Sequence, residues 1–410
     1  MKKREGISFE LKIMCFMISF EILYFLIMIA TRSFFLNAYM VNDFYDSEMD
    51  FFNMLALAGG ADPYRELANY PAMCFFILKF FHRMIPGEML ENEDIVSGKY
   101  LRNYMPVQLA YTVLIMAIVI SSFMIFKKFY KESEKEKNVL AIALVFSGPM
   151  VFAIERGNLI LISFVFSLIY IALYDHNKKY CRIIAYVALA MAASIKMYPA
   201  LLGILTLGKK RYKETALLIA FGLIAFILPF FYFDGIASIR SLLQGITAST
   251  DLQGNFGTGY NFSAANFVRI FGLIFNIDVT TRMLTGVKIG SLILSIVMYI
   301  TANEEWKRVF AIVSIIIWLP EFSYTYTLIF LILPFVVLMN CELKNKIEKI
   351  CLCILGASLL PYALPVLGRI DTTNPKFPLT APTLLINVMI LSVAILILID
   401  NVICHLKERV

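Results

Sequence analysis

Residues Ile183–Gly208 read IIAYVALAMAASIKMYPALLGILTLG, and they set the architecture of the chain. The run is apolar, yet basic residues flank it on both sides, Lys178–Lys179 before it and Lys209–Arg211 after it. Loops rich in lysine and arginine stay on the cytoplasmic side of a membrane, so both ends of the run are predicted there. We therefore expect two short helices that meet at Lys196–Pro199, where Pro199 interrupts the helical hydrogen bonds. Such a broken helix is tolerated at membrane depth where it lines a polar cavity.

The composition of the whole chain is that of a membrane protein. Hydrophobic residues make up 60% and charged residues 16% of its 410 positions, and the mean hydropathy is +0.76. Soluble domains are far more polar. Apolar runs of about 20 residues, bounded by charge, recur along the chain, which predicts an all-α, polytopic fold of about twelve crossings. No linker divides it, so residues 1–410 are expected to form one domain with both termini inside.

The remaining composition excludes several classes of partner. The net charge of +7 does not indicate nucleic acid, because the basic residues lie in short loops between spans. Seven cysteines are an odd number and predict no disulfide framework. The three histidines lack metal-ligand spacing, and there is no phosphate-binding glycine loop. We predict no metal site, no cofactor and a multi-pass protein of the cytoplasmic membrane, in contact with membrane lipid.

The basic loops also order the apolar runs into spans. Leu11–Leu36 is too long for the core of a signal peptide and is predicted to be a retained first span. A first outer loop follows, in which residues around Phe51 and Cys74–Phe81 are expected to form helices lying in the interface, apolar faces on lipid. A second outer segment covers Asp234–Arg282. The other predicted spans are Met105–Phe126, Val139–Ile154, Leu159–Tyr174, Thr215–Phe233, Met283–Ile300, Val309–Pro320, Thr327–Met339, Ile350–Leu367 and Ala381–Ile399.

This topology places the densest polar motifs on the outer side of the membrane, which favours one external active site. Two of its carboxylates, Asp46 and Asp50, are four residues apart and would share one face of a helix. Like charges this close raise one pKa of the pair, so the two could act as a general base and its helper. The alternative is a solvated turn or a helix N-terminus that compensates the dipole.

The outer motifs also contain cations suited to a phosphate. Arg156, held by Glu155, would face a lipid phosphate, or the two would pair with each other in a tight hairpin. Lys196 interrupts an apolar run, where a charge costs a few kcal/mol unless it is paired or hydrated, so it would contact phosphate or snorkel. Arg269 and Arg369 are second candidates for phosphate, or structural salt bridges.

Taken together, these motifs resemble glycosyltransferase family 87, the polyprenyl-phosphate-mannose-dependent mannosyltransferase-like proteins of the C-type glycosyltransferase superfamily. The resemblance covers residue 40 to about residue 335. The matching elements are Asp46, Gly59–Tyr64 and Tyr70–Pro71 in the first outer loop, then Glu155–Asn158, Lys196–Pro199 and Asn261–Ser263. Two departures are Ala72 in place of a second proline and Ser323–Tyr326 where the family often has Trp and His. The second leaves the acceptor and the preference for mannose open.

The resemblance implies a hexosyltransferase that uses a polyprenyl-phosphate sugar donor and a lipid- or glycan-linked acceptor. An Asp base would drive an inverting displacement, with Asp46 as the first choice. The implied substrate-binding residues are Tyr64, Glu155, Asn158, Tyr198, Asn261, Ser263 and Tyr324. A transporter or flippase of lipid-linked glycans would also need a basic cavity and broken helices, and a polysaccharide polymerase would also act on the outer face.

Overall fold

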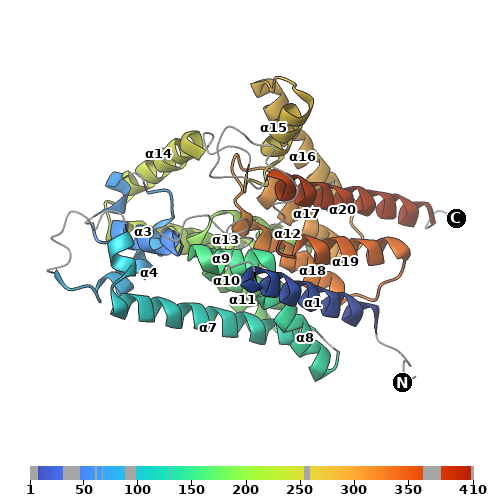
Figure 1. Cartoon of the computed structure of the whole chain (residues 1–410), viewed down its shortest axis with the longest axis horizontal. Helices are drawn as coiled ribbons and strands as arrows, with labels where there is room; N and C mark the ends of the chain where they lie inside the picture. The colour runs from blue at the N-terminus through green and yellow to red at the C-terminus, as the bar shows by residue number, and fades with distance from the viewer. Residues whose placement is uncertain are drawn as a thin grey trace. The chain divides into compact units, whose positions relative to one another are not determined.

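A computed structural model describes residues 8–30, 47–60, 62–66, 68–87, 98–130, 132–253, 259–362 and 380–407. Within these ranges the ordered elements are helices (Figure 1). An isolated β-bridge joins Asn261 to Tyr324. The all-α prediction is confirmed.

The chain divides into two compact units, each built from segments that are distant in sequence. Unit 1 comprises Met1–Asn42, Phe123–Phe152 and Phe256–Val410. Unit 2 comprises Asp43–Ser122 and Ala153–Asn255. Each unit is described separately below, and the single domain expected from the sequence stays a prediction.

Five of the described helical segments are long and apolar enough to cross a membrane. They are α1 (Phe9–Ala30), α7 (Met105–Phe129), Tyr212–Tyr232 (α13, Tyr212–Ile227, with η5, Leu228–Tyr232), α16 (Thr281–Thr301) and Pro382–Leu406 within α20 (Thr380–Lys407). A sixth is possible if α8 (Glu134–Val145) and α9 (Gly148–Arg156), bent by 50°, count as one span. The protein is therefore a multi-pass membrane protein.

The other predicted spans correspond to shorter helices. α10 (Ile160–Leu173) and α17 (Glu305–Trp318) have 14 residues each, about 21 Å at 1.5 Å per residue. A bilayer core is about 30 Å thick. α18 (Ile332–Met339) and α19 (Lys346–Ser358) are shorter still. Twelve crossings therefore stay a prediction.

The predicted break in the Ile183–Gly208 run is confirmed in unit 2. α11 (Lys179–Ile195) ends at Lys196, whose backbone is extended. The chain then continues as η4 (Tyr198–Gly203) and α12 (Ile204–Gly208), with Pro199 in the first turn of η4. α11 packs against α10 and α13. We call α11, η4 and α12 together the hairpin.

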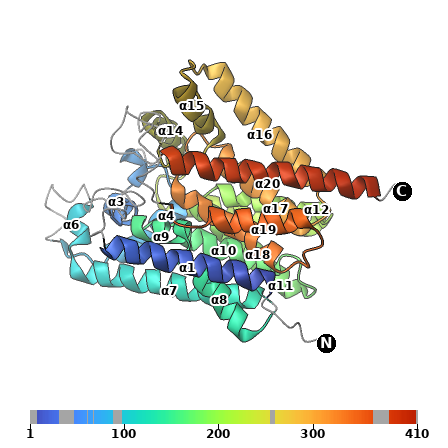
Figure 2. The ribbon, with the colours of Figure 1, turned by 45° about the vertical axis from the view of Figure 1, so that its right-hand side comes forward.

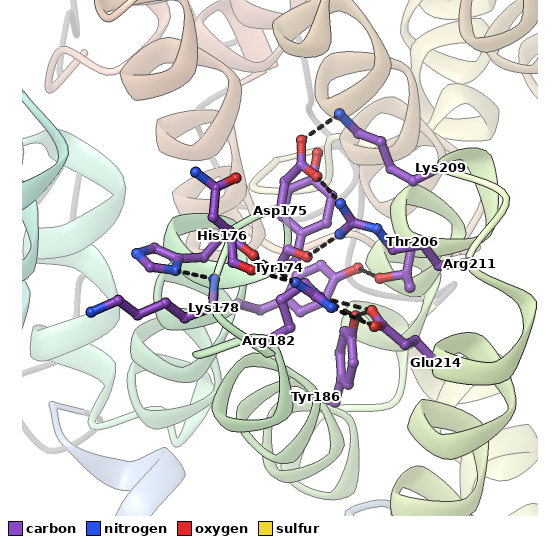
Figure 3. A network of polar contacts seen from close by, with 12 residues as sticks. Tyr174, Asp175, His176, Lys178, Arg182, Tyr186, Thr206, Lys209, Arg211 and Glu214 are labelled. Carbon is purple, nitrogen blue, oxygen red and sulfur yellow. Dashed lines mark hydrogen bonds and ion pairs between the residues drawn. The ribbon is translucent and has the colours of Figure 1, made fainter. Parts of the chain in front are cut away.

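The two basic loops that flank the hairpin meet at one end of unit 2, as the predicted topology requires. Figure 3 shows Arg182 paired with Glu214, and Lys209 and Arg211 both paired with Asp175. The N···O distances are 2.7 Å for Arg182, 2.6 Å for Lys209 and 2.7 Å for Arg211. The run therefore leaves this end and returns to it.

The loop predicted to be the first outer one contains the expected helices, but the orientation expected for one of them is wrong. α3 (Met49–Ala58) carries Phe51, Phe52 and Leu55, which are fully buried rather than facing lipid. Phe51 packs edge-on against Phe81 of α4 (Ala72–His82). Because α4 and its neighbours cover the apolar face of α3, that face lies in the core of unit 2. Of α3 and α4, only α4 has exposed large apolar side chains, which are Phe76 and Phe80.

The segment predicted to be the second outer one is also helical, and its helices belong to different units. α14 (Ile236–Gln253) lies in unit 2 and α15 (Ala264–Phe275) in unit 1. In unit 1, α15 packs on α16 and α20, while α1 packs on α8 and α19 (Figure 2).

Candidate functional site

Asp50 lies in the first turn of α3, two residues after a residue with a left-handed backbone. Glu48, with φ of 62°, is the N-cap of this helix, and its amide donates to the Glu155 carbonyl over 2.7 Å. Gln108 donates to the Glu48 carboxylate over 2.9 Å. Asp46 lies outside the described residues. α3 begins at Met49, so the helix that was expected to place the two aspartates on one face does not continue N-terminal to Glu48.

The Asp50 carboxylate accepts one hydrogen bond at each oxygen. Arg156 Nη2 lies 2.6 Å from Oδ1, and Asn158 Nδ2 lies 2.7 Å from Oδ2. The side chains of Arg156 and Asp50 are only 10% and 19% exposed. A carboxylate has about four acceptor sites, so Asp50 is oriented by these donors and retains capacity for a further hydroxyl.

A glycine turn brings Arg156 and Asn158 to the same carboxylate. Gly157 has φ of +65°, and a Cβ there would lie 3.0 Å from the Glu48 carbonyl oxygen. Side chains rarely adopt this backbone region, and the space next to it is filled. Asn158 is buried, and its Oδ1 accepts the amide of Ile160 at the start of α10. The turn therefore fixes both donors against α3.

Tyr70 joins Lys196 to the same group. Asn158 Nδ2 lies 3.1 Å from Tyr70 Oη, and Lys196 Nζ lies 3.8 Å from the centroid of the Tyr70 ring. The phenol of Tyr64 donates to the Tyr70 carbonyl over 2.9 Å. Burial raises the pKa of Tyr64, so this phenol stays protonated as a donor. We call Asp50, Tyr70, Arg156, Asn158 and Lys196 the Asp50 cluster.

An apolar groove of about 450 Å³ begins beside this cluster in unit 2. It lies between the hairpin and α13, and Met197, the residue after Lys196, is one of its lining residues. Small residues make the space, among them Ala193 and Gly203 of the hairpin and Gly222 of α13. We call it the hairpin groove.

A second polar group lies in unit 1. Arg269 and Lys288 both donate to the Glu321 carboxylate. Burial raises the pKa of Glu321, but the hydrogen bonds from Lys288 and Arg269 outweigh it and hold the pKa below its ordinary value. Ser263 donates to the Glu321 carbonyl over 3.0 Å. We call Arg269, Lys288 and Glu321 the Glu321 cluster.

Asn261 and Ser263, predicted to bind substrate, are buried and hold this loop together. Asn261 Oδ1 accepts the amides of Ser263 and Ser323, each over 3.0 Å. Ser263 caps α15 by accepting the amide of Asn266. The Tyr324 ring packs against Phe322, Tyr326, Tyr260 and Phe152.

The predicted site residues thus fall into two groups, one in each unit. Asp50, Arg156, Asn158 and Lys196 come together, with Tyr198 half-buried at the start of η4. Arg156 pairs with Asp50, a partner that the sequence did not predict. Arg269 has the salt bridge that was its alternative role. Arg369 lies outside the described residues. Their joint action in one outer site stays a prediction.

Sequence reasoning missed three residues of these groups, Tyr70, Lys288 and Glu321. Tyr70 was part of a motif but was not assigned a role, because only the fold brings its ring to Lys196. Lys288 interrupts the apolar run of α16, and the argument that selected Lys196 applies to it equally. A charge inside an apolar run therefore indicates Lys288 as a candidate site residue in the same way as Lys196.

The apolar spans define a multi-pass membrane protein, and one of its two polar clusters, the Asp50 cluster, lies at breaks in its helices. The model of glycosyltransferase family 87 matches residues 99–320, and the chain belongs to this family. It is therefore a membrane glycosyltransferase, an enzyme that uses a sugar donor and an acceptor. Searches of curated proteins and of solved structures found no match. The matched range contains Arg156, Asn158 and Lys196, whereas Asp50 precedes it.

Proposed function

We propose that the protein transfers a hexose, with mannose as first choice, from a polyprenyl-phosphate donor to a lipid- or glycan-linked acceptor. The transfer would take place on the outer face of the cytoplasmic membrane. The observation that carries this proposal is the place of the Asp50 cluster, at the break of the hairpin and beside an apolar groove. A donor of this class has a charged phosphate and a long apolar chain, and the two features fit the two parts of this site.

Lys196 is the residue proposed to hold the donor phosphate. It is half-buried at the break, over the Tyr70 ring, and Arg156 is already paired with Asp50. The phosphodiester of the donor carries one negative charge, which a lysine can neutralise while its strongly hydrated head stays accessible. The next residue, Met197, lines the hairpin groove, which would take the first isoprene units. Arg156 then acts as a positioning residue for Asp50.

The proposed reaction is an inverting displacement at the anomeric carbon. An acceptor hydroxyl loses its proton to an aspartate, and its oxygen forms a bond to the anomeric carbon. The bond from that carbon to the phosphate oxygen breaks, and polyprenyl phosphate leaves with the electron pair. The leaving group gains negative charge in the transition state, and a nearby fixed cation lowers the barrier by stabilising it.

Asp46 stays the first choice for the base, with Asp50 as its helper. Asp50 is already fixed by two hydrogen bonds, one from Arg156 and one from Asn158. Its fixed carboxylate is better suited to accept a hydrogen bond from the acceptor and orient it. The proposal therefore assigns proton removal to Asp46 and positioning to Asp50.

The experiment that tests the proposal measures transfer from labelled polyprenyl-phosphate mannose by the purified protein in nanodiscs, with membrane lipid extract as acceptor. Lys196→Ala should strongly reduce transfer, and Lys196→Arg should retain part of it because the charge remains. Lys213→Ala, an exposed lysine of α13, is the matched control and should be fully active. Full activity of both Lys196 variants would place the phosphate elsewhere. A wild-type protein that transfers sugar only from a nucleotide donor would refute the donor class.

The hairpin groove has its own test. An added Cβ at Gly222 has no heavy atom within 4 Å, so Gly222→Leu should fit without strain and fill part of the groove. We expect a higher KM for the polyprenyl donor and an unchanged KM for a short, water-soluble donor analogue. Ala220→Leu, exposed on α13 and not lining the groove, is the control. Equal effects of the two variants would argue against a chain in this groove.

A further inference from the structure

A second apolar groove, of about 240 Å³, lies within unit 1. It is formed by α15, α16, α17 and α20, which Figure 2 shows close together in gold, orange and red. Its lining includes Phe267, Val287, Gly290, Leu294 and Leu391. We call it the α16 groove.

The Glu321 cluster adjoins one end of the α16 groove. Lys288 follows the lining residue Val287, and Glu321 lies three residues after the lining residue Trp318. Ser263, which donates to the Glu321 carbonyl, precedes the lining residue Ala264. Three separate segments therefore carry the charged group and the apolar lining side by side.

The charge of the Glu321 cluster is unbalanced. Arg269 and Lys288 supply two positive charges, and the carboxylate of Glu321, which they keep ionised, supplies one negative charge. The three side chains are 31%, 28% and 23% exposed, in the order Arg269, Lys288, Glu321. One net positive charge is thus left in a place that a ligand can reach.

The depth of the cluster in the apolar helix indicates an amphiphilic ligand. Lys288 lies seven residues into α16, about 10 Å from its first residue. Only 11% of the most apolar window of α16 is buried within the protein, so lipid contacts this helix. From Lys288 the groove continues along α16 to Leu294, about 9 Å further. An anionic head group at Lys288 would direct its chain along the groove.

We propose that this site binds a phosphate-bearing membrane lipid, with the phosphate at Arg269 and Lys288 and the first part of the chain in the α16 groove. Arginine matches the geometry of phosphate with paired donors, and lysine adds a compact charge. Zwitterionic lipids would gain less, because their own cation competes with the cluster. The site lies in unit 1, whereas the donor site proposed above lies in unit 2, and neither depends on the other.

The test measures lipid binding rather than sugar transfer. The full-length protein is placed in phosphatidylcholine nanodiscs containing phosphatidic acid with a diazirine on its acyl chain, and the labelled peptides are mapped by mass spectrometry. Residues 264–275 and 281–301 should be labelled more strongly by this probe than by a phosphatidylcholine with the same diazirine. Arg269→Gln with Lys288→Gln should reduce the labelling about tenfold or more. Arg282→Gln, an exposed arginine of the same helix, should not change it.

Two further variants separate binding from folding. Glu321→Gln removes the negative charge of the cluster, which raises its net charge from +1 to +2, and should raise labelling by phosphatidic acid, whereas a merely structural salt bridge would predict a loss. Gly290→Leu fills the groove and should lower labelling, while Gly286→Leu, one turn away and outside the lining, should not. Neither glycine has a heavy atom within 4 Å of an added Cβ.

Three results would overturn the proposal. One is equal labelling of these helices by the two lipid probes. Another is a loss of labelling in Glu321→Gln without loss of thermal stability. The third is displacement of the lipid probe by inorganic phosphate alone, which would show that a free phosphate suffices and that the groove is not part of the site.

Discussion

Asp50 and Arg156 offer the sharpest test of whether the Asp50 cluster has a function beyond folding. Their ion pair has an N···O distance of 2.6 Å, and the Arg156 and Asp50 side chains are only 10% and 19% exposed. Asp50→Asn would remove the carboxylate charge that faces the buried guanidinium of Arg156. Breaking a buried pair in this way costs about 3–5 kcal/mol, and the remaining exposure favours the lower end. At about 2 °C per kcal/mol for a large unit, Tm should fall by about 6 °C.

The double variant Asp50→Asn, Arg156→Gln removes both charges and should recover much of that loss. The two residues touch, so their effects should not add, and a coupling of about 1–3 kcal/mol is expected. Tm in nanodiscs, measured by tryptophan fluorescence or a thiol-reactive dye, gives the coupling. If the pair served folding alone, sugar transfer would recover with Tm. If Asp50 orients the acceptor, the double variant should regain stability and keep a raised KM for the acceptor.

Asp46 provides the comparison for the same assay. Removal of a general base reduces the rate by about 10²–10⁴, so Asp46→Asn should nearly abolish transfer with bound donor unchanged. An active Asp46→Asn enzyme together with an inactive Asp50→Asn enzyme would move the base to Asp50. A double variant with wild-type Tm and wild-type kinetics would refute the positioning role. Activity in both single aspartate variants would remove the aspartate base from the mechanism.

Three further predictions follow from single features. Gly157→Ala should lower Tm, because φ of +65° disfavours a side chain by about 1–2 kcal/mol and the new Cβ would lie 3.0 Å from the Glu48 carbonyl oxygen; Gly286→Ala, with open space, is the control. The pKa of Glu321 is lowered in the folded protein, so its ionised form should stabilise the protein above about pH 4.5. This contribution should be lost as the pH falls through the folded-state pKa. The difference in Tm between the wild type and Glu321→Gln should therefore shrink in acid. A cysteine at Arg65 should react with an impermeant thiol reagent from outside and one at Lys135 should not; labelling at Lys135 in sealed cells would reverse the topology.

The sequence was most informative where charge constrained the path of the chain. Basic residues on both sides of Ile183–Gly208 required the run to return to its starting side, and Pro199 marked the place. The structure has α11 ending at Lys196 and the flanking loops joined by Arg182, Lys209 and Arg211. This prediction depended on two local and strong effects, the preference of charges for water and the missing amide of proline.

The prediction was weaker where apolar residues could face either lipid or protein. The apolar pattern around Phe51 and Phe52 predicted a helix face in contact with lipid. In the structure this face packs on α4 and Tyr111, and a face packed on protein has the same apolar pattern. Similarly, Val309–Pro320 was predicted as a span from its apolar residues, and Phe310 and Trp318 of α17 in this run are buried within the protein. Hydropathy measures avoidance of water and does not distinguish lipid from a protein core. The number of crossings therefore could not be read from apolar runs alone.

The partners within the Asp50 cluster were beyond sequence reasoning for a different physical reason. Its members lie where helices begin or end: Asp50 follows the left-handed Glu48, Arg156 and Asn158 flank the left-handed Gly157, and Lys196 lies in the extended break after α11. The hydrophobic periodicity of a sequence predicts structure within helices but not at such breaks, so it could not show which breaks lie close together.

The same breaks make the arrangement useful for catalysis. Glu48 and Gly157 are locked together, through the Glu155 carbonyl and the close approach of Gly157 to the Glu48 carbonyl, so the Asp50 carboxylate is oriented before any substrate arrives. Groups held in advance need no reorganisation when charge develops on a leaving phosphate or an attacking hydroxyl. Gly157→Ala weakens the contact between Gly157 and Glu48 without changing Asp50, and it should therefore lower kcat by more than its effect on Tm explains. An unchanged kcat in a destabilised Gly157→Ala protein would show that this contact serves folding alone.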